Sequence, residues 1–382
     1  MYNNEMYELG NQPSVIRELF AYGLAQAKVV GPENVFDYTL GNPSIPAPAK
    51  VNQSIKDILD EMNSIDVHGY SMAGGFDGAR EAIARNLNER FGTDIKASNL
   101  FITCGAAPAL ISTIKALLAD EKSEIMAVAP FFPEYRPFVE ANGGNLVVVP
   151  ADREHFQIDL AKVEALITEH TQAIIINSPN NPSGVVYTEE TLKALADLLT
   201  KKGEEYGHPI YIIADEPYRE LAYDGVEVPY LTKYYRNTIV GYSYSKSLSL
   251  PGERIGYLVI PDEVDDFENV ICAANVANRI LGFVNAPSLM QLAVSKCLDA
   301  TTDVAAYDAN RKLLYNALTE YGFECAKPEG AFYLWVKAKE DDKAFVAKGK
   351  EFHILMVPGS AFMCPGYVRI AYCVDHAMIE RS

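Results

Sequence analysis

The sequence has few basic residues for its length and no long hydrophobic run. Lysine and arginine total 33 against 51 aspartates and glutamates, which gives the 382-residue chain a formal net charge of -18. Nucleic acid and anionic membranes attract basic surfaces, so this balance argues against both as partners. No apolar stretch of the sequence approaches the ~20 residues that span a bilayer. We therefore expect a protein that binds neither nucleic acid nor a membrane.

Cysteine is scarce as well. The chain has six cysteines, and no two of them lie at the spacing of a metal knuckle. A chain of this length is also unlike a small disulfide scaffold. The first residues, MYNNEMYELGNQ, are polar and acidic, unlike a signal peptide. These features predict a cytoplasmic protein with reduced thiols and no metal site.

The middle of the chain alternates short apolar runs with amphipathic helical stretches. Continuous Val/Ile runs separated by helical patterns are typical of a mostly parallel sheet with helices on both faces. We therefore expect an α/β fold. The runs that predict strands are NLFITCG, SEIMAVAP, GNLVVVPA, QAIIINSP, PIYIIADEP, NTIVGYSYS and RIGYLVIP.

After about residue 285 the pattern changes. A long helical stretch over 288–322 leads into the short strand patterns GAFYLWVKA, HILMVPG and YVRIAYC, which are typical of a smaller α+β domain. We expect an N-terminal arm that joins the small domain over residues 1–45, a large α/β domain over 46–285, and the small domain over 286–382. The final residues, DHAMIERS, follow a helical pattern without a cap signal, so we expect a terminal helix to be missing.

Unusual polar residues follow several of the predicted strands. Asn181 follows AIIIN, Asp215 and Tyr218 follow YIIA, and Ser243 and Lys246 follow IVGY. In a parallel sheet, ligands bind beyond the carboxyl ends of the strands. Polar residues at several successive strand ends therefore predict one shared pocket.

Together these residue types suit pyridoxal phosphate. The amine of Lys246 can form a Schiff base with an aldehyde, particularly if burial beside cations lowers its pKa. A buried Asp215 requires a cation, which a protonated pyridine nitrogen supplies. Asn181 and Tyr218 can bind a phenolate oxygen, while Arg254 and a helix N-terminus can bind a phosphate.

The segment SYSKSLSLPGERIGY, residues 243–257, resembles the signature S-x-S-K-x-x-x-x-P-G-x-R-x-G-Y of class I/II pyridoxal-phosphate aminotransferases. The sequence is similar to this fold-type I family, the aspartate aminotransferase superfamily, over nearly its whole length. The resemblance implies a large domain with a mostly parallel seven-stranded sheet, a smaller α+β domain, and Lys246 as the catalytic lysine that carries the cofactor. Asp215 matches the partner of the pyridine nitrogen, and Asn181 and Tyr218 match the partners of the cofactor oxygen.

The resemblance also implies how the phosphate is bound. Ser243 and Arg254 match phosphate ligands, and Ser245 is a weaker candidate. GAAPAL resembles the phosphate loop, although it has alanines where commoner versions have a second glycine or a serine. Its backbone at Gly105, Ala106 and Ala107 should therefore face the phosphate.

Other matches concern the substrate and the partner subunit. Phe132 matches the aromatic residue that stacks on the cofactor ring, and Tyr70 the residue that reaches the phosphate of the neighbouring subunit. Arg369, in YVRIAYC, matches the arginine that binds the substrate α-carboxylate, with Gly41 and Asn181 beside it. The resemblance therefore implies a homodimer with shared active sites.

The sequence defines the amino-acid substrate less closely than it defines the cofactor site. Arg279 lies about one residue from the position where aspartate aminotransferases place an arginine for the side-chain carboxylate, which slightly favours aspartate or glutamate. Without that contact, aromatic and neutral amino acids are equally plausible substrates.

A C–S (β-)lyase on the same fold is a further alternative to an aminotransferase. A sensor of the transcription-regulator type would need a basic DNA-binding domain, which this sequence does not have, and an acyl transferase fits NNPSG and PGERIGY poorly. We favour transfer of an amino group from an L-amino acid to a 2-oxo acid.

Overall fold

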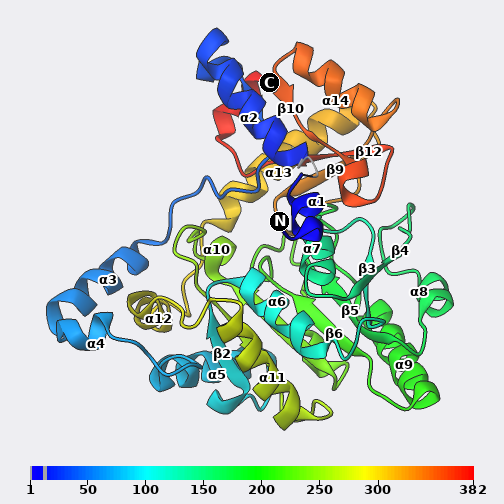
Figure 1. Cartoon of the computed structure of the whole chain (residues 1–382). Helices are drawn as coiled ribbons and strands as arrows, with labels where there is room; N and C mark the ends of the chain where they lie inside the picture. Colours follow the sequence, from blue (N-terminus) through cyan, green and yellow to red (C-terminus); the bar gives the residue numbers. More distant parts are fainter. Residues whose placement is uncertain (1, 12–14) are drawn as a thin grey trace.

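A seven-stranded sheet forms the centre of the computed structural model, which describes residues 2–11 and 15–382 (Figure 1). Its strand order is β2-β8-β7-β6-β5-β3-β4. The strands from β7 to β4 are parallel to their neighbours, whereas β8 is antiparallel to both β7 and β2. This confirms the predicted α/β fold. The strands are β2 (Leu100–Thr103), β3 (Glu124–Val128), β4 (Asn145–Val149), β5 (Thr171–Asn177), β6 (Tyr211–Asp215), β7 (Thr238–Ser243) and β8 (Gly256–Val259).

Both faces of the sheet are covered by helices, which explains why its central strands are apolar throughout. On β5, Ile174 and Ile176 belong to one core cluster, while Ala173 and Ile175 belong to another on the opposite face. This is the alternation of side chains that a strand imposes. Helices α6 (Ala106–Leu117) and α11 (Phe267–Ile280) cover the second of these faces (Figure 1). The first cluster takes in α3 (Ala49–Glu61), α5 (Asp77–Phe91), α8 (Leu160–Leu166) and α9 (Glu189–Tyr206).

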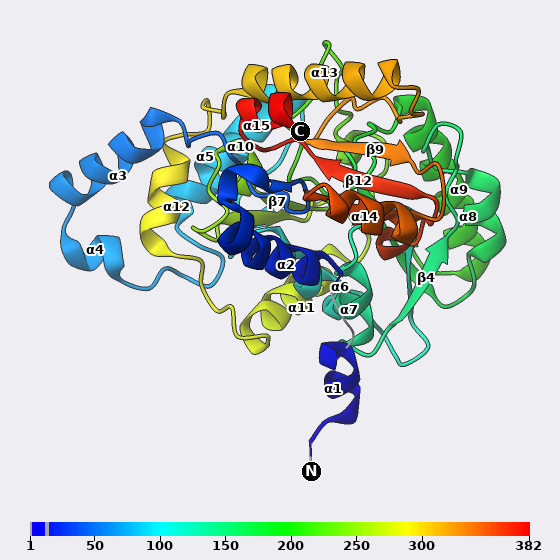
Figure 2. The same cartoon turned by 90° about the horizontal axis from the view of Figure 1, so that it is seen from above.

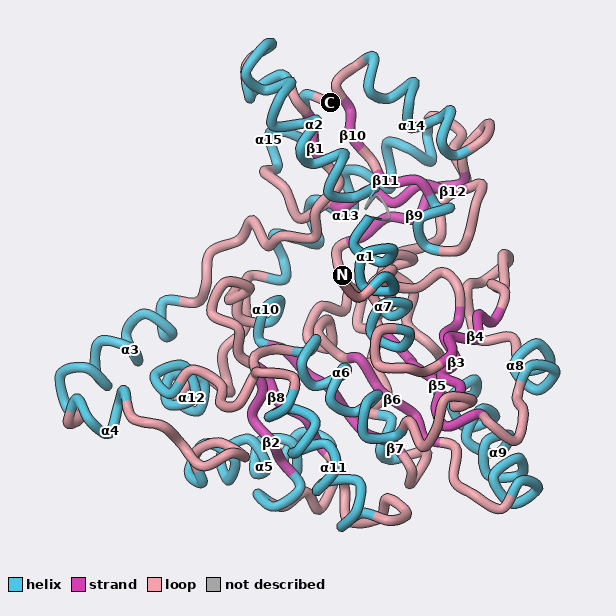
Figure 3. The backbone as a smooth tube through the Cα atoms, viewed as in Figure 1, coloured by secondary structure: helices cyan, strands magenta, loops and turns pink. Residues whose placement is uncertain are grey.

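A third core cluster packs around a smaller sheet of order β11-β12-β9, which lies above the central sheet in Figure 3. Trp335 and Phe362 lie in this core and are fully buried. The short strand β1 pairs with β10, so the start of the chain is joined to its C-terminal part. The small sheet consists of β9 (Tyr333–Lys337), β11 (Val357–Pro358) and β12 (Tyr367–Ala371), while β1 (Phe36–Asp37) and β10 (Ile354–Leu355) form a separate two-stranded sheet.

Helices surround this second sheet, and α1 projects away from the rest of the molecule (Figure 2). They are α2 (Val15–Val30), α13 (Val304–Glu320), α14 (Asp342–Glu351) and α15 (His376–Arg381), while α1 covers Asn4–Asn11. Three short helices lie within the larger unit: α4 (Ser64–His68), α7 (Tyr135–Glu140) and α10 (Tyr244–Ser247). Among the described residues, none of the helices combines the length and the apolar character needed to cross a membrane.

The prediction of a long helical stretch over 288–322 is wrong, because the structure divides this segment into α12 (Ser288–Ser295) and α13. Asp303 begins the second helix, and its side chain accepts a hydrogen bond from the backbone N–H of Ala306. This is an N-cap, which stabilises a new helix start. Met290 and Val294 of α12 pack in the core of the larger unit. The exact domain boundaries stay a prediction.

Candidate active site

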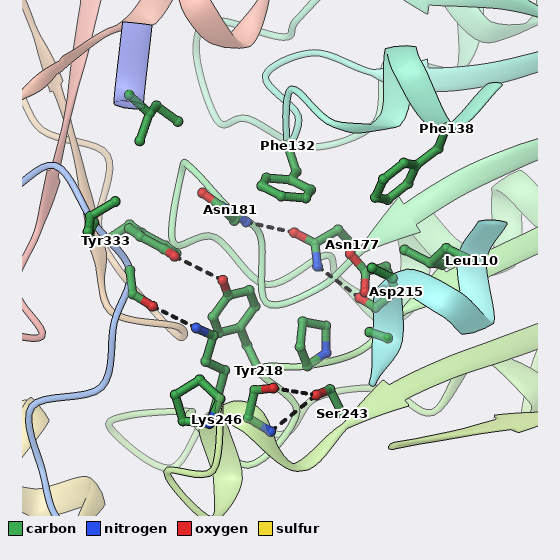
Figure 4. Close-up of a pocket in the computed structure, with 18 of the residues that line it drawn as sticks. Leu110, Phe132, Phe138, Asn177, Asn181, Asp215, Tyr218, Ser243, Lys246 and Tyr333 are labelled. Carbon is green, nitrogen blue, oxygen red and sulfur yellow. Dashed lines mark hydrogen bonds between the residues drawn. The ribbon is translucent and has the colours of Figure 1, made fainter. Parts of the chain in front are cut away.

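A cavity of about 320 Å³ lies where three parallel strands end and the small sheet begins. The ends of β5, β6 and β7 contribute Asn177, Asp215 and Ser243 to its wall. Figure 4 shows these side chains facing a common space together with Lys246. The structure thus brings together most of the predicted site. The predicted residues that line the cavity are Gly41, Ala106, Ala107, Phe132, Asn181, Asp215, Tyr218, Ser243, Ser245, Lys246, Arg254 and Arg369.

Lys246 lies in the single turn of α10. This helix begins after Ser243, whose side chain accepts a hydrogen bond from the backbone N–H of Ser245. The Nζ of Lys246 donates a hydrogen bond of 2.6 Å to the carbonyl oxygen of Gly41. Burial is the largest cause that lowers the pKa of Lys246, to about 8, and the nearby cations Arg369 and Arg254 act in the same direction. A large fraction of this amine is therefore neutral and nucleophilic near pH 8.

Asp215 is a buried carboxyl group at the end of β6. Its Oδ2 accepts a hydrogen bond of 2.6 Å from the hydroxyl of Tyr135, and its backbone carbonyl accepts one of 2.8 Å from Asn177. Its Oδ1 has no hydrogen-bond partner among the described residues. Burial raises the pKa of Asp215 to about 7, although the bond from Tyr135 opposes this. A cation beside Oδ1 would stabilise the ionised form.

Arg369 is a buried cation on β12. Its guanidinium lies 4.6 Å from the ring centroid of Tyr333 and 4.8 Å from that of Phe362. Its Nη1 donates a hydrogen bond of 2.9 Å to Oδ1 of Asn181, and its Nη2 donates one to the carbonyl oxygen of Thr39. Nε has no partner, and none of the ion pairs found within residues 2–11 and 15–382 includes Arg369. The site therefore holds a positive charge that an incoming anion could neutralise.

The other end of the cavity suits a phosphate. The hydroxyl oxygens of Ser243 and Ser245 lie 2.7 Å apart. Gly105 precedes α6 with a φ of 97°, and a Cβ at this position would lie only 2.9 Å from Nη2 of Arg254. A glycine therefore lets the backbone approach the arginine closely. The first N–H groups of α6, including those of Ala106 and Ala107, have no partner within the helix and can bind an anion.

Three predicted residues are not part of the cavity wall: Gly105, which lies behind it at the start of α6 beside Arg254, and Tyr70 and Arg279, which lie farther away. Tyr70, in the segment after α4, is 92% exposed, and Arg279 is exposed in the last turn of α11. The side chain of Arg279 makes no hydrogen bond or ion pair with any described residue. Neither Tyr70 nor Arg279 lines this cavity in the single chain.

Several residues of the site were not predicted from the sequence. Asn177 lies four residues before Asn181, and its Oδ1 accepts the backbone N–H of that residue at 2.7 Å. Its place at the end of an apolar run was a usable signal. Tyr135, the first residue of α7, lies three residues after the predicted Phe132 and donates a hydrogen bond to Asp215. Nothing in the sequence around Tyr333 indicated that it lines the cavity. Apolar parts of the wall come from Ile16, Leu110 and Phe138.

Comparison with known proteins decides the family. The model for "Aminotransferase class I and II" matches residues 33–382. The chain belongs to this aminotransferase family. The aspartate aminotransferase of Thermotoga maritima is 31% identical over 94% of this chain and 91% of its own length. Aromatic-amino-acid aminotransferase 2 of Thermococcus litoralis is 30% identical over 97% of this chain and 94% of its own. A crystal structure of an aminotransferase from Eubacterium rectale is 55% identical, covers 100% of this chain and 96% of its own, and has a TM-score of 0.98.

The aminotransferase family implies pyridoxal phosphate, and the residues present fit this group. The unpartnered Oδ1 of Asp215 suits a protonated pyridine nitrogen. The amine of Lys246 has a lowered pKa and suits an aldehyde. The close approach of Gly105 to Arg254 forms a cradle that any Cβ would fill. The chemistry of the cavity thus matches three separate parts of the cofactor.

In the cofactor-free aminotransferase, Asp215→Asn should increase stability at high pH. The raised pKa of about 7 means that folded wild-type protein binds an extra proton below that pH and loses stability as the pH rises from ~4 to ~7. Asparagine does not titrate and can still accept the hydroxyl of Tyr135. Urea unfolding should therefore show an advantage of the variant that widens by about 2–3 kcal/mol between pH 5 and pH 8.

The matched control is Asp60→Asn, which changes an exposed aspartate of α3. Its stability difference from the wild type should stay flat over the same pH range. An Asp215→Asn curve that runs parallel to the wild type would contradict the raised pKa.

Proposed function

We propose that this aminotransferase binds pyridoxal phosphate at the cavity and transfers the amino group of an L-amino acid, with aspartate or glutamate favoured, to a 2-oxo acid. One observation carries the proposal. The buried guanidinium of Arg369 has an unpartnered Nε and no carboxylate partner among the described residues, and it shares one cavity with Lys246. A buried unpaired cation is costly, and the α-carboxylate of an amino acid is a matching anion.

The cofactor would be held by residues at both ends of the cavity. Lys246 would hold its aldehyde carbon, Asp215 its ring nitrogen, and Asn181 and Tyr218 its ring oxygen. Phe132 would lie against the ring. The phosphate would be bound by Ser243, Ser245, Arg254 and the backbone of Gly105, Ala106 and Ala107.

When bound, pyridoxal phosphate supplies an electron sink for the negative charge that develops at the substrate α-carbon. The protein residues prepare this chemistry. Arg369 binds the α-carboxylate, with Gly41 beside it, and so orients the Cα–H bond. Once free of the cofactor, the Nζ of Lys246 would take the proton from the substrate α-carbon and donate it to the carbon of the cofactor that Lys246 had held. Asp215 as a carboxylate stabilises a positive charge on the ring nitrogen.

The substrate class rests on the relatives and on the charges of the wall. Curated relatives are named for aspartate in Thermotoga maritima and for aromatic amino acids in Thermococcus litoralis. The lysines and arginines that line the cavity are Lys246, Arg254 and Arg369, and each already has a proposed function. A side-chain carboxylate therefore needs a cation from elsewhere. Arg279, exposed and without a hydrogen-bond or ion-pair partner for its side chain among the described residues, is the candidate that a second subunit would supply.

A homodimer would complete the site. Tyr70 is 92% exposed, and Ile65 and Met72 near it are 78% and 76% exposed. Large apolar side chains grouped on a surface mark an interface. In a dimer, Tyr70 would reach the phosphate of the neighbouring subunit.

The protein would work in the cytoplasm, because the exposed free thiol of Cys272 fits a reducing compartment.

Replacing Lys246 by alanine should lower turnover by about 10²–10⁴-fold, because the general base is lost. The purified wild type should take up pyridoxal phosphate with a yellow absorbance band, and the amino acid that bleaches it should be the substrate. Aspartate, phenylalanine, methionine and alanine are to be compared. Lys337→Ala, at an exposed lysine on β9, is the control and should keep full activity. Ordinary multiple turnover in Lys246→Ala would contradict the proposal.

Mixing two inactive variants tests the shared site. Tyr70→Ala and Lys246→Ala homodimers should each be weak or inactive. A mixed dimer has one site with both residues intact, because Lys246 comes from one chain and Tyr70 from the other. Activity should therefore reappear after the two proteins are unfolded together and refolded. Activity no higher than the sum of the separate variants would exclude an active site shared through Tyr70.

Arg279→Ala should lower kcat/KM for aspartate by about 10–150-fold, because a hydrogen bond between charged groups contributes about 1.5–3 kcal/mol. The value for phenylalanine should stay within about twofold. Arg236→Ala is the matched control. Arg236 is an exposed arginine just before β7, and the cavity lies at the other end of this strand. An equal loss for both substrates would contradict recognition of a side-chain carboxylate by Arg279.

A further inference from the structure

Tyr333 occupies a central place in the cavity that its local sequence does not reveal. It is 2% exposed, and its hydroxyl lies 2.9 Å from that of Tyr218, with either atom able to donate (Figure 4). Its ring lies against the guanidinium of Arg369, at 4.6 Å. A Cβ on Gly41 would overlap the Tyr333 hydroxyl, so that backbone segment also contacts it. One side chain therefore touches both the predicted carboxylate site and a predicted cofactor ligand.

The small sheet explains this position. In the β9–β12 register, Tyr333 lies opposite Ala371, and Arg369 lies opposite Trp335. Tyr333 and Arg369 are thus diagonal neighbours on the same face of the sheet, a spacing that long side chains can bridge. Residues 36 positions apart in the sequence are held in contact by a rigid ladder, so their relative geometry is well defined.

The number of protons decides the direction of the hydrogen bond. Each phenol has one proton, and burial raises the pKa of both hydroxyls, so both are neutral donors near pH 7. If Tyr218 donates its proton to the ring oxygen of the cofactor, its own oxygen becomes an acceptor. Tyr333 must then donate to Tyr218. Hydrogen bonds in such a chain strengthen one another, so Tyr218 becomes a better donor.

We infer that Tyr333 is a positioning residue that links substrate binding to the cofactor: its hydroxyl orients and strengthens Tyr218 as a donor, and its ring holds Arg369 in place. This inference rests on the proposed function. It assigns the two parts of one side chain to two different steps. The hydroxyl acts on the electronic state of the bound cofactor, while the ring acts on the affinity for the substrate carboxylate.

Tyr333→Phe removes only the hydroxyl and tests its part. A weaker Tyr218 donor leaves more negative charge on the cofactor oxygen, which favours the protonated form of the nitrogen that joins Lys246 to the cofactor. The midpoint of the pH titration of the cofactor absorbance should therefore rise by about 0.1–0.7 pH units. KM for the amino acid should stay within about twofold. Tyr223→Phe is the matched control: it removes an equally buried hydroxyl that donates to the Ala331 carbonyl, outside the cavity wall, and should leave the midpoint unchanged.

Two further variants separate the hydroxyl from the ring. Tyr333→Leu also removes the ring, so KM should rise by about 2–30-fold, the range of a lost cation–π contact. In a Tyr218→Phe background, adding Tyr333→Phe should no longer move the midpoint, because the hydroxyl acts through Tyr218. A midpoint shift of equal size in both backgrounds would overturn the inference, as would equal KM values in Tyr333→Leu and the wild type.

The failure of this inference is distinguishable from failure of the proposed function. Wild-type protein that takes up no pyridoxal phosphate would contradict the proposed function itself. Protein that loads the cofactor and titrates normally, but whose midpoint does not move in Tyr333→Phe, would contradict only the assignment of Tyr333.

Discussion

The unpaired positive charge of Arg369 is the constraint on which the arrangement of the cavity depends. Removing a guanidinium from water is costly unless its donors are satisfied. Here Asn181, the carbonyl of Thr39 and the rings of Tyr333 and Phe362 satisfy it in part, and Nε stays open. These partners come from distant parts of the chain, so the two sheets must be held together for the charge to be tolerated.

The same principle applies to Asp215 and Lys246. Ionising these groups is opposed by burial, and the pKa shifts to about 7 and about 8 bring both close to physiological pH. A chain selected only for stability would pair these charges or replace them by apolar residues. Keeping them separate around one cavity is a cost in stability that a ligand with complementary charges would offset. Groups with strongly perturbed pKa values in one cleft are typical of functional sites.

The fold supplies the precision that such a site needs. The carboxyl ends of β5, β6 and β7 place Asn177, Asp215 and Ser243 on rigid elements rather than on long loops. Tyr135 then fixes one oxygen of Asp215 from α7, and the β9–β12 ladder fixes Arg369 against Tyr333. Side chains locked in this way keep their geometry before any ligand arrives, which reduces the reorganisation required during reaction.

The α/β class, the seven central strands and the polar residues that follow them could be predicted from the pattern of the sequence. A buried parallel strand must be apolar along its length, and the polar residues that follow it, such as Asn181 and Lys246, then lie at the same end of the sheet. Other residues of the cavity wall, such as Gly41 and Arg369, could be predicted only from the resemblance to the aminotransferase family. The prediction of a long helical stretch over 288–322 was wrong, because the helical pattern continues across the break before the cap at Asp303. Tertiary structure alone decided the pairs Tyr135–Asp215, Tyr218–Tyr333 and Tyr333–Arg369. Those contacts depend on helix packing and on strand register, and neither is expressed in the local spacing of residues along the chain.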